Sequence, residues 1–226
     1  MSIECTNNRG ESNMQKKAEN RTEKGILVAI EGIDGSGKTI QSRILRNRLK
    51  KEEYEVELFR EPTDGKWGKK IRDLAINGRD KVTPKTEFEY FLFDRKEDVE
   101  RNIKPALENK KIVIMDRYYL SSVAYQGARG LNQNLIEEEN QKIAPIPDVT
   151  IIIDTPPHIA LTRIKKRGSD PNFFERENYL ANVRANYLNR YKGKENVIVI
   201  DGNQSIERIA SEIWNVLKKI VKKHIE

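Results

Sequence analysis

The stretch EGIDGSGKTIQ, residues 31–41, joins the apolar run ILVAI (26–30) to the basic, amphipathic run TIQSRILRNRLK (39–50). Within it, residues 32–39 fit the phosphate-binding pattern G-x-x-x-x-G-K-[ST]. The pattern stands where its function requires it, after a strand candidate and before a helix candidate. We therefore predict a phosphate-binding loop at the first strand-to-helix turn of an α/β nucleotide-binding fold.

The residue types of this loop suit a nucleoside triphosphate. Its glycines let backbone N–H groups turn inward, and the start of the following helix adds a partial positive charge. Lys38 is expected to reach the terminal phosphates, and Thr39 can hold Mg²⁺. The pattern leaves open whether ATP or GTP binds. The predicted nucleotide-binding residues are Gly32, Ile33, Asp34, Gly35, Ser36, Gly37, Lys38 and Thr39.

The rest of the chain alternates short β-rich runs with longer helical patterns. Most of the short runs are nearly continuous Ile and Val, which is typical of parallel strands buried on both faces. This order predicts an α/β fold, a doubly wound five-stranded parallel sheet flanked by helices, with a helical lid. The strand candidates are 26–31, 54–59, 111–116, 149–154 and 196–201. The helix candidates are a long helix over 88–107 and two apolar faces, formed by Ile40, Ile44, Leu45 and Leu49 and by Ile206, Ile209, Ile213, Leu217 and Ile220.

Length and composition narrow the class of protein. With 226 residues, 37% hydrophobic and 34% charged, the chain is long enough for one globular domain with a substantial core. It is short for two such domains. We expect one domain over 25–226 after a disordered polar extension, 1–24. Because no apolar run approaches the ~20 residues of a membrane span and no signal peptide is visible, we expect a cytoplasmic protein without membrane contact. The single cysteine and two isolated histidines argue against a disulfide and a zinc site.

Lysine and arginine outnumber the acidic residues by 42 to 35. Such an excess suits a polyanionic partner, either nucleic acid or a multiply charged nucleotide, and it equally suits a solvated basic surface. The basic residues are spread along the chain, with clusters only at 163–176 and at the C-terminal end, where a helix dipole would favour them. We therefore expect no nucleic-acid partner.

Several classes of protein share the loop pattern. A GTPase should carry an N/T-K-x-D guanine reader after a late strand, whereas the nearest match, RKED at 95–98, lies inside a helical pattern. An ATPase that remodels a polymer would usually be larger and carry oligomer-spanning elements. A kinase of small molecules is the remaining class.

A second segment, DRYYLSSVAYQ at 116–126, follows directly on the strand candidate KIVIM. Asp116 and Arg117 would stand at the carboxyl end of a parallel strand, where such folds bind ligands. Arg117 can grip a phosphate bidentately, and Asp116 can position a Mg²⁺-bound water or the acceptor. The alternative is that the two residues pair with each other.

These motifs resemble those of the thymidylate kinase family. EGIDGSGKT, FREP (59–62), FLFDR (91–95), IKPAL (103–107), DRYYLSSVAYQG (116–127) and PDVTIIID (147–154) run in family order, over roughly residues 25–215. The resemblance implies Mg²⁺-dependent transfer of the γ-phosphoryl group of ATP to dTMP, giving dTDP and ADP in dTTP biosynthesis, by a homodimer. The alternatives are a kinase of another nucleotide or nucleoside and a P-loop nucleic-acid-binding ATPase.

The resemblance also assigns roles to residues around the acceptor. Asp34 would hold the acceptor sugar or the metal, although an Asp in a loop can also act as a cap. Phe91 and Arg95 lie one helical turn apart and would stack on the thymine ring and hydrogen-bond its edge. A Phe in a helix is otherwise a core residue. Arg60 could point into the site or support its strand, and that choice stays open.

The segment after Asp116 would complete the acceptor site. Ser121 and Ser122 would contact the base, or else cap a helix. Tyr125 would close on the sugar and leave no space for a 2′-hydroxyl. The role of Gln126 stays open. The predicted substrate-binding residues are Asp34, Phe91, Arg95, Arg117, Ser121, Ser122 and Tyr125.

Charge dictates the expected mechanism. Phosphate monoesters have a second pKa of about 6, so the acceptor needs positioning and charge neutralisation more than a strong base. Some family members carry an arginine in the loop where this chain has Gly35, and RIKKRGSDPNFFER (163–176) is the natural replacement, either as a mobile lid or as a solvated helix end. Its candidates are Arg163, Lys166, Arg167 and Arg176, and Arg167, beside Gly168, is preferred. The predicted catalytic residues are Lys38, Asp116, Arg117 and Arg167.

Overall fold

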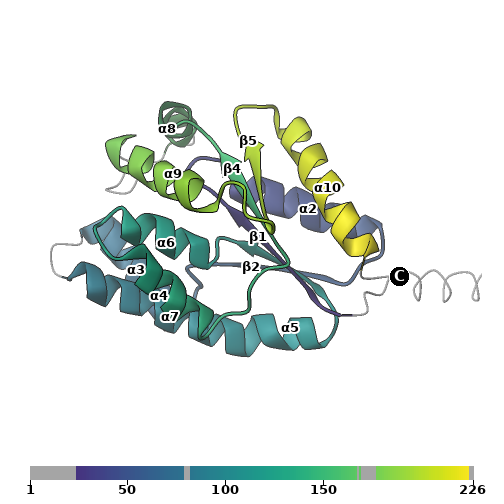
Figure 1. Cartoon of the computed structure of the whole chain (residues 1–226), viewed down its shortest axis with the longest axis horizontal. Coiled ribbons are helices and arrows are strands. Elements are labelled where there is room, and N and C mark those ends of the chain that lie inside the picture. The colour runs from purple at the N-terminus through teal and green to yellow at the C-terminus, as the bar shows by residue number, and fades with distance from the viewer. Residues whose placement is uncertain (1–23, 79–81, 167, 169–176, 224–226) are drawn as a thin grey trace, which may run out of the picture.

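The computed structural model describes residues 24–78, 82–166, 168 and 177–223, and its frame is one parallel sheet (Figure 1). The strand order is β2-β3-β1-β4-β5, and all four pairings are parallel. The predicted doubly wound α/β fold is confirmed, and each strand begins at or shortly after its predicted residue. The elements are β1 (Ile26–Glu31), α2 (Lys38–Lys51), β2 (Val56–Arg60), α3 (Lys66–Asn77), α4 (Pro84–Asp98), η1 (Val99–Ile103), α5 (Lys104–Glu108), β3 (Ile112–Asp116), α6 (Tyr119–Gly127), α7 (Gln133–Gln141), β4 (Val149–Asp154), α8 (Pro157–Lys166), α9 (Glu177–Tyr191), β5 (Val197–Asp201) and α10 (Ile206–Lys222).

The sheet is buried on both faces, as its continuous Ile and Val runs predict. Every residue of β1 is buried, and alternate side chains enter different cores. Leu27 and Ala29 pack with residues of α6, α7 and α9, whereas Ile26, Val28 and Ile30 pack with residues of α2 and α10. Figure 1 shows α2 and α10 on one side of the sheet and the remaining long helices on the other.

The long helix predicted over 88–107 is three joined segments, α4, η1 and α5. It begins earlier than predicted, at Pro84, because the Thr83 hydroxyl caps it by accepting a hydrogen bond from the Thr86 N–H. The middle segment is a π-helix, and Pro105 lies just beyond it. Because proline lacks an N–H, it cannot make the i→i−4 bond, and a wider turn fits the chain before it.

Two residues of the predicted helix faces are exposed. Ile40 and Ile206 are each 46% exposed, whereas Leu45, Leu49, Ile209, Ile213 and Leu217 are buried. Both isoleucines lie in the first turn of their helices. At the start of α2 the buried positions belong to the polar residues Lys38, Gln41 and Ser42, and the Gln41 amide donates to the Ile206 carbonyl at 2.9 Å. The starts of the two helices are therefore joined by a polar hydrogen bond and not by the isoleucines of the predicted apolar faces.

The topology gathers three loops at one edge of the sheet. β1 lies between β3 and β4, so the turns that follow these strands are neighbours at their carboxyl ends. This edge is the ligand-binding crevice of open α/β sheets. Among the described residues, none of the helices has the length and apolar character needed to cross a membrane.

Candidate active site

The phosphate-binding loop is built by β1 and closed by α2. Gly37 caps α2 at φ 99°, and the Ser36 N–H donates to the Ile33 carbonyl at 3.2 Å, which turns the chain back on itself. The Lys38 ammonium lies inside the loop, where it donates to the carbonyls of Gly32 at 3.0 Å and Ile33 at 2.7 Å. Burial, and then the nearby Arg117, lower the pKa of Lys38 to about 7.

Gly35 is a loop position that tolerates no side chain. Its φ is +81°, and a Cβ built there would lie 2.4 Å from the carbonyl oxygen of Ala160 on α8. Both the backbone conformation and the packing therefore require glycine. An arginine at this position is excluded for a steric reason, which explains the departure noted in the sequence.

Thr39 and Asp116 meet where the loop faces the end of β3. The Thr39 hydroxyl donates to an Asp116 carboxylate oxygen at 2.6 Å, and Arg60 Nε lies 3.9 Å from the same oxygen. A hydroxyl and a carboxylate are the oxygen ligands that Mg²⁺ prefers. The two residues thus fit a site for that ion or its bound water.

Arg117 turns away from Asp116 and pairs with Asp34 instead. Its φ is +74°, and its N–H donates to the Ile30 carbonyl at 3.1 Å. Its guanidinium forms an ion pair with Asp34, donates to Ser121 Oγ at 3.2 Å and lies over the Tyr125 ring at 5.0 Å. Burial acts to raise the pKa of the Asp34 carboxyl, but Arg117 and Lys38 outweigh it and hold the pKa below its ordinary value.

Tyr125 ties the loop to α6. Its hydroxyl accepts from the Asp34 N–H at 2.9 Å and donates to the Asp34 carboxylate at 3.1 Å. The end of the phosphate loop and the acceptor segment therefore share one hydrogen-bonded group, Asp34–Arg117–Tyr125.

A buried carboxylate, Glu31, holds the start of α6 next to the Asp34–Arg117–Tyr125 group. It accepts from the N–H groups of Tyr118 at 2.9 Å and Ser121 at 3.1 Å, from the Ser121 hydroxyl at 2.6 Å and from the Tyr187 hydroxyl at 2.9 Å. Burial raises the pKa of Glu31 despite these bonds. Ser121, predicted to contact a base, thus donates its hydroxyl proton to Glu31. Glu31 ends the predicted strand and Tyr187 lies on α9, so nothing in the sequence brought the pair together.

One pocket holds the predicted acceptor residues. It is open to solvent, and its empty volume is about 780 Å³ with the mouth included. It joins the loop residue Asp34 to side chains from β2, α3, α4 and α6. The lining residues are Asp34, Arg60, Glu61, Pro62, Ile71, Arg72, Ala75, Phe91, Arg95, Arg117, Tyr118, Ser121, Ser122, Tyr125 and Gln126.

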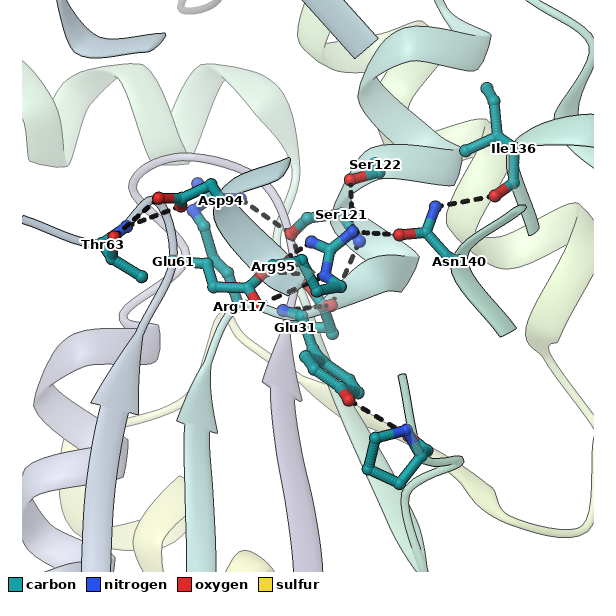
Figure 2. Close-up of polar contacts among 12 residues, drawn as sticks. Glu31, Glu61, Thr63, Asp94, Arg95, Arg117, Ser121, Ser122, Ile136 and Asn140 are labelled. Atoms are coloured by element: carbon teal, nitrogen blue, oxygen red, sulfur yellow. Dashed lines mark hydrogen bonds and ion pairs between the residues drawn. The ribbon is translucent and has the colours of Figure 1, made fainter. Parts of the chain in front are cut away.

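Arg95 stands at the inner end of this pocket in a polar cage (Figure 2). Its Nε lies 2.9 Å from a Glu61 oxygen, and its Nη2 pairs with the same carboxylate. On the opposite edge its Nη1 donates to Ser122 Oγ at 3.1 Å and to Asn140 Oδ1. Burial acts to lower the pKa of Arg95, but Glu61 outweighs it and raises the pKa. Glu61 belongs to the FREP motif, but the sequence predicted no role for it. No sequence signal pointed to Asn140.

Three further polar residues line the pocket. Gln126, left open from the sequence, is buried, and neither of its side-chain polar atoms has a partner among the described residues. Arg60, also left open, has a side chain that is 65% exposed. Arg72, missed by the sequence, donates to the carbonyls of Pro62 at 3.0 Å and Thr63 at 2.7 Å.

The predicted lid is described only at its start. Arg163 donates to the Gly202 carbonyl at 2.9 Å, so its guanidinium is bound at the end of β5. Lys166 is exposed. Arg167, the preferred catalytic candidate, and Arg176 lie outside the described residues.

Comparison with known proteins decides the family. A sequence model described as thymidylate kinase matches residues 30–213. The chain belongs to the thymidylate kinase family. It is 42% identical to a probable thymidylate kinase of Archaeoglobus fulgidus, over 87% of this chain and 96% of that protein. It is 40% identical to a thymidylate kinase of Akkermansia muciniphila, over 86% of this chain and 92% of that protein, and 45% identical to one of Xanthomonas campestris pv. campestris, over 71% and 70%.

Membership confirms the predicted function, thymidylate kinase activity with ATP as the phosphoryl donor. The alternatives, a kinase of another nucleotide or nucleoside and a nucleic-acid-binding ATPase, are not favoured. The family match also spans the phosphate loop from residue 30 and the whole acceptor pocket, so the pocket is a candidate site of a thymidylate kinase.

Proposed function

We propose that dTMP binds in the Phe91–Arg95 pocket and receives the γ-phosphoryl group of ATP held by the loop, as a step of dTTP synthesis. The observation that carries this proposal is Asp34, which belongs to the phosphate loop, lines the acceptor pocket and forms an ion pair with Arg117. Donor and acceptor sites therefore adjoin each other at Asp34, and a direct transfer requires such proximity.

In this proposal the pocket recognises base and sugar separately. Phe91 offers an aromatic face to the thymine ring, and Arg95 offers hydrogen-bond donors to its edge. Gln126 adds a buried amide that needs partners, because an unpaired buried polar group is costly. Ser122 completes the pocket wall beside the thymine base. Tyr125, which makes two hydrogen bonds with Asp34, would exclude a 2′-hydroxyl.

The donor side supplies charge. Lys38 is placed to neutralise terminal phosphates, and the loop N–H groups and the start of α2 add their dipoles. Thr39 and Asp116 would hold Mg²⁺, which supplies charge neutralisation at the phosphates, and Asp34 is a further candidate ligand from the sequence. Arg117 would grip the acceptor phosphate. Arg167 stays the preferred lid residue for the charge that Gly35 cannot provide.

Two further parts of the proposal concern the protein as a whole. We propose that it works in the cytoplasm and as a homodimer, which the family resemblance implies. Sedimentation of the purified protein over a range of concentrations tests the second part. A single monomeric species at micromolar concentration would overturn it.

The substrate assignment is tested by measuring ADP release from Mg-ATP with dTMP, dUMP, dCMP, dGMP, UMP and thymidine offered separately. We expect strong turnover with dTMP, weaker turnover with dUMP and none with UMP. A matched Lys38→Met variant, measured at the same protein concentration, controls for contaminating kinases. Turnover with thymidine but not with dTMP would replace the proposal by a nucleoside kinase.

A further inference from the structure

The cage around Arg95 leaves its guanidinium almost no freedom. A guanidinium has five N–H donors. The Nε–H and one Nη2–H face Glu61, while the two Nη1–H groups face Ser122 and Asn140. Among the described residues, one N–H on Nη2 is left for a ligand. The side chain is 1% exposed, so these contacts are made in a low-dielectric interior.

Asn140 lies behind the pocket and is absent from its lining. It belongs to α7 and is completely buried. Its Nδ2 donates to the Ile136 carbonyl one turn earlier at 2.7 Å. This bond fixes the orientation of the amide, because a flipped amide would turn its N–H groups toward the N–H groups of Arg95. Asn140 therefore presents only an acceptor, Oδ1, to the arginine.

The contacts on the two edges of the guanidinium have different consequences. Glu61 holds the Nε–Nη2 edge and would by itself let the group swing about that edge. Asn140 and Ser122 hold Nη1 on the other side, which fixes the plane and rotation (Figure 2). The remaining donor thus has one direction in the pocket, beside Phe91 on the same helix face.

A fixed donor discriminates between base edges. A guanidinium has no acceptor, so it bonds a ring carbonyl and is mismatched with an amino group. If the donor faces position 4 of a pyrimidine, it distinguishes a 4-oxo base, such as thymine or uracil, from the 4-amino base cytosine. A donor that could rotate away would relax this choice, because a buried group left unpaired is what rejects the wrong ligand.

We propose that Asn140 is a positioning residue that, through Arg95, sets the selectivity for 4-oxo over 4-amino pyrimidine monophosphates. The inference rests on the proposed acceptor site and adds a residue outside that site. Asn140 makes no contact with the nucleotide itself in this proposal.

The test compares Asn140→Leu with the wild-type protein. Leucine is similar in size and removes the acceptor. We expect the ratio of kcat/KM for dTMP to that for dCMP to fall by about tenfold, since a hydrogen bond to a charged group is lost. The KM for ATP should stay within about twofold. Ile136→Val, on the same helix, is the matched control: it trims the core without removing an acceptor and should leave the ratio unchanged.

Two further variants separate positioning from a structural role. Asn140→Asp keeps an acceptor toward Arg95 and should hold the ratio within about threefold of the wild type. Asn140→Ser is too short to reach Arg95, yet its hydroxyl can bond the Ile136 carbonyl. In Asn140→Ser the ratio of kcat/KM for dTMP to that for dCMP should fall as far as it does in Asn140→Leu. If Asn140→Leu does not fold, Asn140→Ser takes its place in the test.

A double-mutant cycle supplies the decisive outcome. In an Arg95→Met background, Asn140→Ser should cause no further change in the ratio, because the residue acts only through Arg95. An unchanged ratio in folded Asn140→Leu or Asn140→Ser, or additive effects in the cycle, would overturn the inference. If the wild type proved to prefer another acceptor, the substrate assignment would fail, while dUMP against dCMP would still test Asn140.

Discussion

The phosphate loop and the Arg95 cage each hold a buried cationic side chain in place, but they are built from different parts of the chain. The loop is one continuous segment, residues 32–39, whose glycines, carbonyls and lysine follow each other in sequence. The cage draws its members from four separate places: Glu61 after β2, Arg95 on α4, Ser122 on α6 and Asn140 on α7. The loop depends on local geometry, whereas the cage depends on tertiary packing.

The difference has an energetic side. The loop lysine, Lys38, is held by carbonyls of its own segment, those of Gly32 and Ile33. The cage buries a charged pair, which is strongly destabilising if one member is removed and much less so if both are. Damage to the loop should therefore affect the reaction, and damage to the cage should affect both recognition and folding.

The largest expected effect is on chemistry at the loop. Lys38→Met should lower kcat by about 10³-fold, because a charge that stabilises the transferring phosphoryl group is lost. Steady-state ADP release measures kcat, and calorimetry measures the affinity for dTMP, which should stay within about twofold. Lys50→Met, in the exposed last turn of the same helix, is the control. An equal loss of dTMP affinity would break the separation of loop and cage.

The next effect tests the cage as a buried pair. Arg95→Met should lower kcat/KM for dTMP by about 10²-fold and lower the free energy of unfolding by about 3–5 kcal/mol, since Glu61 is left buried without its cation. Urea denaturation measures the second quantity. Affinity for ATP should be preserved, and equal loss of ATP and dTMP use would contradict the assignment of Arg95 to the base site.

A second substitution sharpens that result. Adding Glu61→Gln to Arg95→Met removes the uncompensated charge, so much of the lost stability should return. Use of dTMP should not return, because the donor to the base is still missing. Recovery of both would mean that Arg95 serves folding alone.

A smaller effect is expected at the mouth of the pocket. The Arg60 side chain is 65% exposed, and its Nε lies 3.9 Å from Asp116, so solvent screens whatever charge it offers an acceptor phosphate. Arg60→Ala should raise the KM for dTMP by no more than about fivefold, and less at high salt. Initial rates at two ionic strengths measure this, with exposed Arg43→Ala as the control. A hundredfold effect would place Arg60 in the transferring centre.

The smallest expected effect is the uptake of a fraction of a proton by Lys38 when ATP binds. The pKa of Lys38 is lowered to about 7, so at pH 8 most of the ammonium has lost its proton, and bound phosphates would raise the pKa again. ATP binding at pH 8 should therefore take up a proton, at most about one, and less at pH 6. Calorimetry in two buffers of different ionisation enthalpy measures the uptake. Its persistence in Lys38→Met would assign it to another group.

The same comparison explains what the sequence could predict. The loop, the five strands and the fold class follow from local patterns, because spacing and hydrophobic runs are local quantities. Phe91 and Arg95 lie one helical turn apart, and the family resemblance, not the spacing alone, implied their shared role at the base. Asn140 and Tyr187 could not be found, because each meets the site only through long-range packing. Ile40 and Ile206 show the limit of periodicity, since the first turn of a helix can project beyond the core it serves.

The close approach of Gly35 to Ala160 has a consequence for how this enzyme can change over time. A Cβ at residue 35 would collide with a main-chain carbonyl, which no rotamer change on α8 can move. A single substitution therefore cannot place an arginine at this position of the loop. An arginine there would require a coordinated shift of α8 and the loop, so it is separated from the present sequence by a backbone barrier and not by one codon.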